Sequence, residues 1–218
     1  MRIAILGGTG NLGIGLSLRL AIAGYEVVVG SRSEEKAIAR AEEYKNLLSK
    51  KGYVGKITGA QNLFAAEICD IAIITVPWEN AFSLAEKLKS ALADKIVLSP
   101  LVPMKKEGKF FRYVELPEGS ASEKIAGILN ESKIVAAFQN IPAERFADLD
   151  AKFEWDVVVC GDETDAKRKV IEIINQIKGL RALDAGDLQI SRITERLTVL
   201  ILNIMATNRF GEISVKFC

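Results

Sequence analysis

Three glycines near the start of the chain have the spacing of a phosphate-binding turn. Gly8, Gly10 and Gly13 form a G-x-G-x-x-G pattern that directly follows a short apolar run at 2–6. In this pattern the first glycine permits a tight turn, and the second lets the backbone approach a pyrophosphate without an intervening Cβ. The third glycine lets the following helix pack closely on the strand. The spacing therefore predicts a dinucleotide site.

A glycine-rich turn that binds nothing is the alternative to this prediction. The turn lies between a predicted strand and a helical pattern that runs to Ala23 and is closed by Gly24. The N-terminus of such a helix offers free N–H donors and a partial positive charge to phosphates. Four glycines within 7–13 also cost chain entropy. These features favour a bound dinucleotide over an empty turn.

The end of the second predicted strand, 25–29, indicates which dinucleotide is bound. Folds that bind NAD usually carry a carboxylate there for the adenosine ribose hydroxyls. This chain instead has Ser31 and Arg32, with Lys36 one helical turn further on. A hydroxyl, a guanidinium and an ammonium would hold a ribose phosphate, which a carboxylate would repel. We therefore expect NADP(H) rather than NAD(H), the alternative being that these cations are ordinary surface charges.

The chain contains no histidine. This absence excludes Ser-His and Cys-His nucleophilic catalysis, the usual zinc sites, and dehydrogenases that use a histidine as proton acceptor. Any chemistry must use lysine, tyrosine, a carboxylate or no protein base. We expect no metal site.

Charge and cysteine content narrow the class of partner. The net charge is +1, which gives no bulk electrostatic reason to expect binding to nucleic acid or to a membrane. The apolar runs are shorter than a membrane span. The three cysteines lie far apart without metal-ligand spacing, which is typical of a reduced, cytoplasmic chain. Because Met1-Arg2 leads directly into a strand, we expect no signal peptide.

Strands and helices alternate along the part of the chain that must position these residues. We predict strands at 57–59, 70–77, 96–98 and 134–138, and helices at 33–48, 80–92 and 120–129, with a short helix capped by Asn62. This alternation implies right-handed βαβ crossovers and an α/β, doubly wound, mainly parallel sheet of the Rossmann type. Ligands bind beyond the carboxyl ends of such strands. Residues 75–77 and 101–103 are therefore expected near the nicotinamide.

Residues 1–145 are predicted to form the NADP-binding domain, and 146–218 a small C-terminal α/β extension that packs on it. The extension has predicted strands at 156–160 and 180–183 and helices at 165–177 and 189–203. The last helix carries an apolar stripe, which fits a core helix and a dimer interface equally well. The apolar segment 213–217 could cover the active site or a partner.

The segment 104–119 is predicted to be a loop. It is rich in lysine and glycine and contains Lys105, Lys106, Lys109 and Arg112. These cations could meet an acidic ligand, but a solvated loop is the simpler interpretation and the one we favour.

Several stretches of the chain resemble the archaeal coenzyme F420-dependent NADP reductases. They are the opening from Met1 to Gly13 and the stretches 29–32, 75–78, 99–103 and 200–205. The resemblance covers the whole chain. It implies a homodimer that transfers hydride reversibly between reduced coenzyme F420, a 5-deazaflavin, and NADP. It also implies that the deazaflavin stacks on the nicotinamide in a cleft.

The resemblance implies roles for individual residues as well. The residues that would hold NADP are Thr9, Gly10, Asn11, Leu12, Ser31, Arg32 and Lys36. Those along its nicotinamide end would be Val76, Val102 and Ala143, and those facing the deazaflavin Gln139, Ile141 and Ile213. Some members carry a histidine where this chain has Gln139, so an ionisable group near the deazaflavin is missing. Hydride passes directly between the two cofactors, and we expect no catalytic side chain.

Three alternatives remain open at this point. The first is an NADP-dependent imine reductase related to pyrroline-carboxylate reductase, which needs a substantial helical C-terminal part. Here the chain after Ala143 is short and partly sheet-like. The second is an NADP-sensing protein without turnover. The third is a flavin in place of the deazaflavin, because the two differ at one ring atom that no residue pattern distinguishes.

Overall fold

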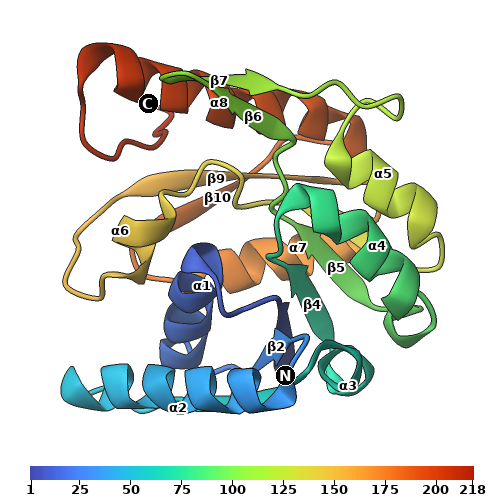
Figure 1. Ribbon diagram of the computed structural model, residues 1–218, viewed down its shortest axis with the longest axis vertical. Helices are drawn as coiled ribbons and strands as arrows, with labels where there is room; N and C mark the ends of the chain where they lie inside the picture. Colours follow the sequence, from blue (N-terminus) through green and yellow to red (C-terminus); the bar gives the residue numbers. More distant parts are fainter.

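An eight-stranded sheet runs through the molecule in the computed structural model, which describes residues 1–218 (Figure 1). Its order is β3-β2-β1-β4-β5-β8-β9-β10. The strands are β1 (Arg2–Leu6), β2 (Glu26–Ser31), β3 (Lys56–Gln61), β4 (Ile71–Ile74), β5 (Ile96–Ser99), β8 (Lys133–Ala136), β9 (Trp155–Gly161) and β10 (Leu180–Asp184). All neighbours pair in parallel except β8 and β9. The predicted doubly wound, mainly parallel α/β sheet is confirmed.

Helices cover both faces of this sheet. They are α1 (Asn11–Ile22), α2 (Glu34–Lys50), α3 (Asn62–Ile68), α4 (Trp78–Leu88), α5 (Ala121–Ile128), α6 (Ala143–Ala147), α7 (Thr164–Asn175) and α8 (Ser191–Asn208). In β1, Ile3 and Ile5 face the apolar core under α1, α2 and α7, whereas Ala4 and Leu6 face the core under α3, α4 and α5. Burial on both faces explains why the strands are continuous apolar runs.

The segment predicted as a loop at 104–119 contains a β-hairpin, so that prediction was wrong. Strands β6 (Met104–Glu107) and β7 (Phe110–Tyr113) pair in antiparallel fashion around Gly108, whose φ is +60°. The strands are short and β6 is largely charged and exposed, so the sequence shows no alternating apolar pattern. The hairpin rests on α8, where the Asn203 side chain makes 2.9 Å hydrogen bonds to both the N–H and the C=O of Phe111.

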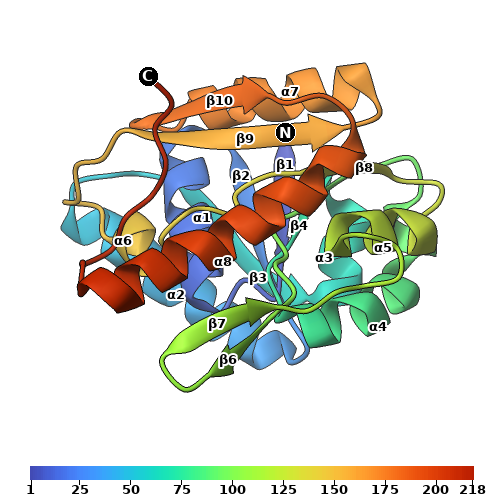
Figure 2. The same cartoon turned by 90° about the horizontal axis from the view of Figure 1, so that it is seen from above.

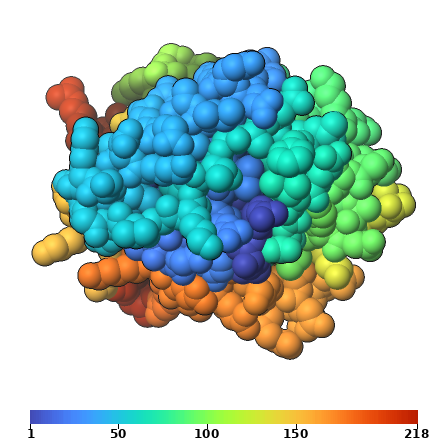
Figure 3. Space-filling model, turned by 90° about the horizontal axis from the view of Figure 1, so that it is seen from below, coloured from blue at the N-terminus to red at the C-terminus, as the bar shows by residue number.

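Helix α8 forms a layer above the carboxyl ends of the strands. Figure 2 shows it crossing over the sheet edge, with the hairpin on one side and the last residues of the chain on the other. It runs to Asn208, further than the predicted end at 203. The opposite face of the molecule, seen in Figure 3, carries the N-terminal residues beside α2 and lies away from this layer.

Buried Glu195 attaches α8 to the rest of the fold. Its carboxylate accepts hydrogen bonds from the N–H groups of Ala121 and Ser122 at 3.0 and 3.1 Å, and from the Ser122 and Tyr113 hydroxyls at 3.0 and 2.8 Å. Burial raises the pKa of Glu195 above its ordinary value. The carboxylate lies at the N-terminus of α5, where the helix dipole favours a negative charge. A single side chain thus joins α5, β7 and α8.

Candidate cofactor site

The glycine turn after β1 leaves helix α1 with an open N-terminus. Gly7 has φ of +78°, and a Cβ there would lie 2.3 Å from Val76 Cγ1, so only glycine fits. The helix cap is Gly10, which offers no side-chain cap. No backbone acceptor binds the N–H groups of Asn11, Leu12 or Gly13. Free N–H donors at a helix N-terminus suit a phosphate.

Two of the patterned glycines differ in what surrounds them. A Cβ on Gly13 would lie 2.6 Å from three backbone atoms of Gly8, so Gly13 allows the turn and the helix to touch. A Cβ on Gly10 would meet only Gly7 O, at 4.0 Å. The space beside Gly10 is therefore open, as a close approach by a ligand requires.

Two side chains hold this turn in place, and neither role was found from the sequence. Tyr44 of α2 donates from its hydroxyl to Gly8 O at 3.0 Å, and its burial raises the pKa of Tyr44 to about 12. Asn62 Oδ1 accepts from the Gly7 N–H at 3.2 Å. The prediction that Asn62 caps its helix was wrong, because Gln61 is the cap residue and the Asn62 side chain serves the turn instead. A single tyrosine among the charged and aliphatic residues of α2 was the only signal available in the sequence.

The end of β2 carries two cations without an acidic partner. Ser31 is buried at the last position of β2, and Arg32 and Lys36 are exposed beside it. Neither cation takes part in an ion pair, unlike Arg40 and Lys45 further along α2, which pair with Glu43 and Glu42. The Gly8 N–H donates to Gly30 O at 3.0 Å, so this strand end adjoins the glycine turn. The pair of free cations suits a second phosphate next to the first.

A cavity of about 710 Å³ lies beyond the carboxyl ends of β1, β4, β5 and β8. It brings together several of the residues singled out from the sequence: Asn11, Leu12, Val76, Val102, Gln139, Ile141, Ala143 and Ile213. The remaining ones lie outside the cavity, on the turn and at the end of β2: Gly8, Thr9, Gly10, Gly13, Ser31, Arg32 and Lys36. The two sets adjoin each other, because Asn11 and Leu12 of the cavity lining directly follow Thr9 and Gly10 of the glycine turn.

Gln139 has its side-chain amide fixed in one orientation. Its Nε2 donates to Ser99 O at 3.1 Å, and its backbone O accepts from Thr198 Oγ1 of α8 at 2.7 Å. The preceding Phe138 has φ of +71°, which is unusual for a residue with a side chain. No protein group donates to Gln139 Oε1, so this oxygen can accept a hydrogen bond from a ligand.

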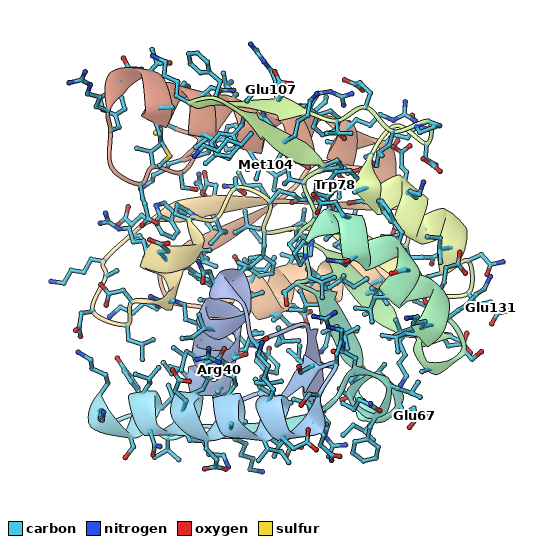
Figure 4. All side chains as sticks on the ribbon, viewed as in Figure 1. Arg40, Glu67, Trp78, Met104, Glu107 and Glu131 are labelled. Carbon is cyan, nitrogen blue, oxygen red and sulfur yellow. The ribbon has the colours of Figure 1, made fainter.

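Trp78 and Met104 close one side of the cavity. Trp78 Nε1 donates to Met104 O at 3.2 Å, which ties the start of α4 to the start of the hairpin. Figure 4 shows the two labelled residues next to each other at this junction. This contact was not predicted, because the hairpin that begins at Met104 was not predicted.

The cavity lining contains no lysine, arginine, cysteine or tyrosine, and its only ionisable residues are Glu79, Glu144 and Glu212. No cluster of metal-binding side chains is present in the chain. No helix has the length and apolar character needed to cross a bilayer. The cavity is thus suited to positioning ligands that carry their own chemistry.

Comparison with known proteins identifies similar chains. Residues 2–103 match the family model described as NADP oxidoreductase coenzyme F420-dependent. The chain is 42% identical to the F420-dependent NADP reductase of Methanocaldococcus jannaschii over 94% of this chain and 92% of that protein. It is 36% identical to that of Methanothermobacter marburgensis, over 99% and 97%. A solved structure of a putative F420 dependent NADP-reductase from Arthrobacter sp. FB24 has the same fold, with a TM-score of 0.83 at 22% identity and coverage of 100% and 99%.

Proposed function

Because the chain belongs to the family of coenzyme F420-dependent NADP oxidoreductases, it transfers hydride between coenzyme F420 and NADP, and we propose that both molecules meet in the cavity above the sheet edge. The observation that carries this placement is that the glycine turn adjoins the cavity. A dinucleotide whose pyrophosphate lies on α1 would extend its nicotinamide toward the ends of β4 and β5, as ligands of doubly wound sheets do.

We place the adenosine end of NADP on Ser31, Arg32 and Lys36, where two cations lack acidic partners. The pyrophosphate lies against Thr9 and Gly10 and the open N–H groups of Asn11 and Leu12. Backbone donors and unpaired cations are the groups that bind phosphates most strongly in proteins. This assignment uses open N–H groups at the start of α1 and both unpaired cations at the end of β2.

The nicotinamide end is proposed to run along Val76, Val102 and Ala143, with the deazaflavin against Gln139, Ile141 and Ile213. The two bound rings supply the hydride chemistry themselves. The protein side chains orient the rings, and the apolar lining keeps water away from them. Proximity and orientation alone can lower a barrier by about 7–11 kcal/mol when the reacting atoms are well aligned. An ionisable side chain is therefore not required for the hydride step.

Mixing the purified protein with oxidised F420 and NADPH is expected to bleach the deazaflavin absorbance rapidly. The bleaching follows from hydride transfer to the ring, and NADH should support it at least about 100-fold less well if a phosphate on Arg32 and Lys36 drives binding. FMN and pyrroline-carboxylate serve as comparison acceptors. Tight NADPH binding without bleaching would reject the deazaflavin reductase and favour the imine reductase or the NADP sensor.

We also propose that the protein is a homodimer that associates through α8. One face of this helix is buried in the fold, while Ile193, Leu200 and Ile204 are exposed at 65%, 55% and 36%. Their spacing places them on one side of the helix. An exposed apolar stripe of this kind supports association with a second copy.

Leu200→Asp is expected to halve the molecular mass measured by sedimentation equilibrium, because a carboxylate would be buried in the interface. The matched control is Val54→Asp, which adds the same charge at a residue that is 93% exposed on a loop far from α8 in the chain. A monomeric wild-type protein, or a dimer unaffected by Leu200→Asp, would refute this interface.

Two broader assignments complete the proposal. We assign 1–145 to NADP binding and 146–218 to an extension that completes the deazaflavin side of the cavity through α8 and Ile213. We assign the protein to the cytoplasm, because its three cysteines are free and two of them, Cys69 and Cys160, are buried thiols.

A further inference from the structure

The first half of strand β9 has an edge that its neighbour β8 does not cover. The two strands pair only at Val135 with Gly161 and at Ala136 with Cys160. On the other edge, β10 pairs with β9 along Trp155–Val159. The backbone of Asp156 therefore needs partners from outside the sheet on its open edge.

The C-terminal segment 212–218 supplies part of this cover. The Asp156 N–H donates to Val215 O at 2.9 Å, and the Phe217 N–H donates to the Asp156 carboxylate at 2.6 Å. Arg181 binds both oxygens of that carboxylate at 2.7 Å and the Phe217 carbonyl at 2.6 Å. The Arg181 guanidinium, as the main cause, holds the pKa of Asp156 below its ordinary value. The segment is thus fixed along β9 rather than projecting into solvent.

Asn140 joins this segment to the loop that lines the cavity. Its Nδ2 donates to Asp156 O at 2.8 Å and to Ser214 Oγ at 3.2 Å. The Ser214 hydroxyl in turn donates to the Asn140 carbonyl at 2.8 Å. We call this arrangement of Asn140, Ser214 and the Asp156 backbone the clasp. Asn140 itself is 7% exposed, so its bonds have little competition from water.

Each end of the clasp is adjacent in sequence to a residue that lines the cavity. Asn140 lines the cavity itself, between Gln139 and Ile141, and Ser214 follows the lining residue Ile213. We propose that Asn140 is a positioning residue that holds Ile213 beside the 139–141 loop, on the deazaflavin side of the cavity. This inference rests on the proposed meeting of both cofactors in the cavity. Nothing else in the hydrogen-bond network links Ile213 or its flanking residues to that loop.

A purely structural role for Asn140 makes a different prediction. If it only covered the edge of β9, its loss would lower stability and affect binding of both cofactors alike. If it acts through Ile213, its loss should slow hydride transfer while NADPH still binds, because Ser31, Arg32 and Lys36 at the end of β2 lie outside the cavity lining. The two roles are therefore separable by experiment.

The test is a double-mutant cycle between Asn140 and Ile213, followed by single-turnover reduction of F420. We expect Asn140→Ala and Ile213→Ala each to slow hydride transfer about 10-fold, and the double variant to be within about threefold of Ile213→Ala alone, because residues that act through one another are not additive. The dissociation constant for NADPH should change less than about twofold in all three. Ser214→Ala should reproduce the Asn140→Ala effect more weakly, and Ser214→Thr, which keeps the hydroxyl, should restore the rate.

Asn175→Ala is the matched control, because it removes an asparagine side chain whose Oδ1 accepts a 2.8 Å hydrogen bond from the Ala182 N–H on β10, outside the cavity lining. It should leave hydride transfer unchanged. Additive effects, or equal weakening of NADPH binding, would overturn the positioning role.

Amide hydrogen exchange tests the clasp without any turnover. In Asn140→Ala the Asp156 amide should exchange at least about 10-fold faster than in the wild type, because the segment that carries its acceptor, Val215 O, loses the bond between Asn140 Nδ2 and Ser214. Unchanged exchange would refute the clasp even in an active enzyme. A wild-type protein that does not reduce F420 would instead refute the proposed function, whatever the exchange result.

Discussion

Replacing Arg32 by aspartate is expected to lower kcat/KM for NADPH by about 100-fold, because a charge-assisted bidentate contact is lost and a repulsive charge is added, together about 3 kcal/mol. The same change should alter kcat/KM for NADH by less than about threefold, since NADH has no ribose phosphate at this position. Arg32 is exposed and in no ion pair, so its removal leaves no buried partner unsatisfied. Steady-state kinetics with both dinucleotides measures the ratio directly.

Lys45→Asp provides the matched control for this change. Lys45 lies on the same helix α2 and pairs with Glu42, far from the end of β2 in the sequence. Lys45→Asp changes the net charge by the same amount as Arg32→Asp. Any loss of kcat/KM caused by net charge alone would therefore be seen in both variants. Equal losses for NADPH and NADH in Arg32→Asp would contradict the phosphate site. A loss in Lys45→Asp as large as in Arg32→Asp would mean that the effect is not local.

The salt dependence of NADPH binding is a second test of the phosphate site at Arg32 and Lys36. Lys36 is exposed and unpaired like Arg32, so the contribution of both cations to NADPH binding should be screened as ionic strength rises. The difference in affinity between NADPH and NADH should therefore narrow with salt in the wild type. In Arg32→Asp the remaining difference is small at every salt concentration.

The parts of the fold that were predicted from the sequence are those set by short-range patterns. The glycine spacing at 8–13 and the buried strand predicted at 70–77 each depend on residues close together in the chain. Helix α1 follows the glycine turn as predicted, and the strand is present but shorter, at Ile71–Ile74. Ser33, the first residue of the helix predicted at 33–48, is of the same kind: it caps α2, and its hydroxyl accepts from the Lys36 N–H three residues away. Local geometry and periodicity are enough to identify such features.

The features that were missed depend on partners far away in the sequence. Asn62 meets Gly7 across 55 residues, and Asn140 meets Ser214 across 74. The hairpin is stable because Phe111 bonds to Asn203, 92 residues further on. From the neighbouring sequence alone, an asparagine is expected to cap a helix or occupy a turn. Which distant backbone group its side chain binds depends on the tertiary structure. The hydrogen bonds around the cavity could therefore not be predicted from the sequence, although several residues that line the cavity were.

Replacing Gly10 by alanine is expected to weaken NADPH binding by at least about 100-fold while changing the free energy of unfolding by less than about 1 kcal/mol. The added methyl group meets no protein atom closer than 4.0 Å, and Gly10 has φ of −93°, which alanine adopts readily. The only space that the methyl occupies is the space from which a pyrophosphate would approach the N–H groups of α1. Stability and affinity should thus separate in this variant.

Gly13→Ala is the contrasting variant of the same turn, and it should lower both the stability of the protein and its affinity for NADPH. Its methyl group would lie 2.6 Å from the Gly8 backbone, so the turn or helix α1 must move, at a cost of about 1–3 kcal/mol in stability. Urea unfolding and calorimetric titration with NADPH measure the two quantities independently. If Gly10→Ala bound NADPH as tightly as the wild type, no phosphate could approach the backbone at Gly10. The dinucleotide would then have to lie elsewhere, despite the open donors at Asn11 and Leu12.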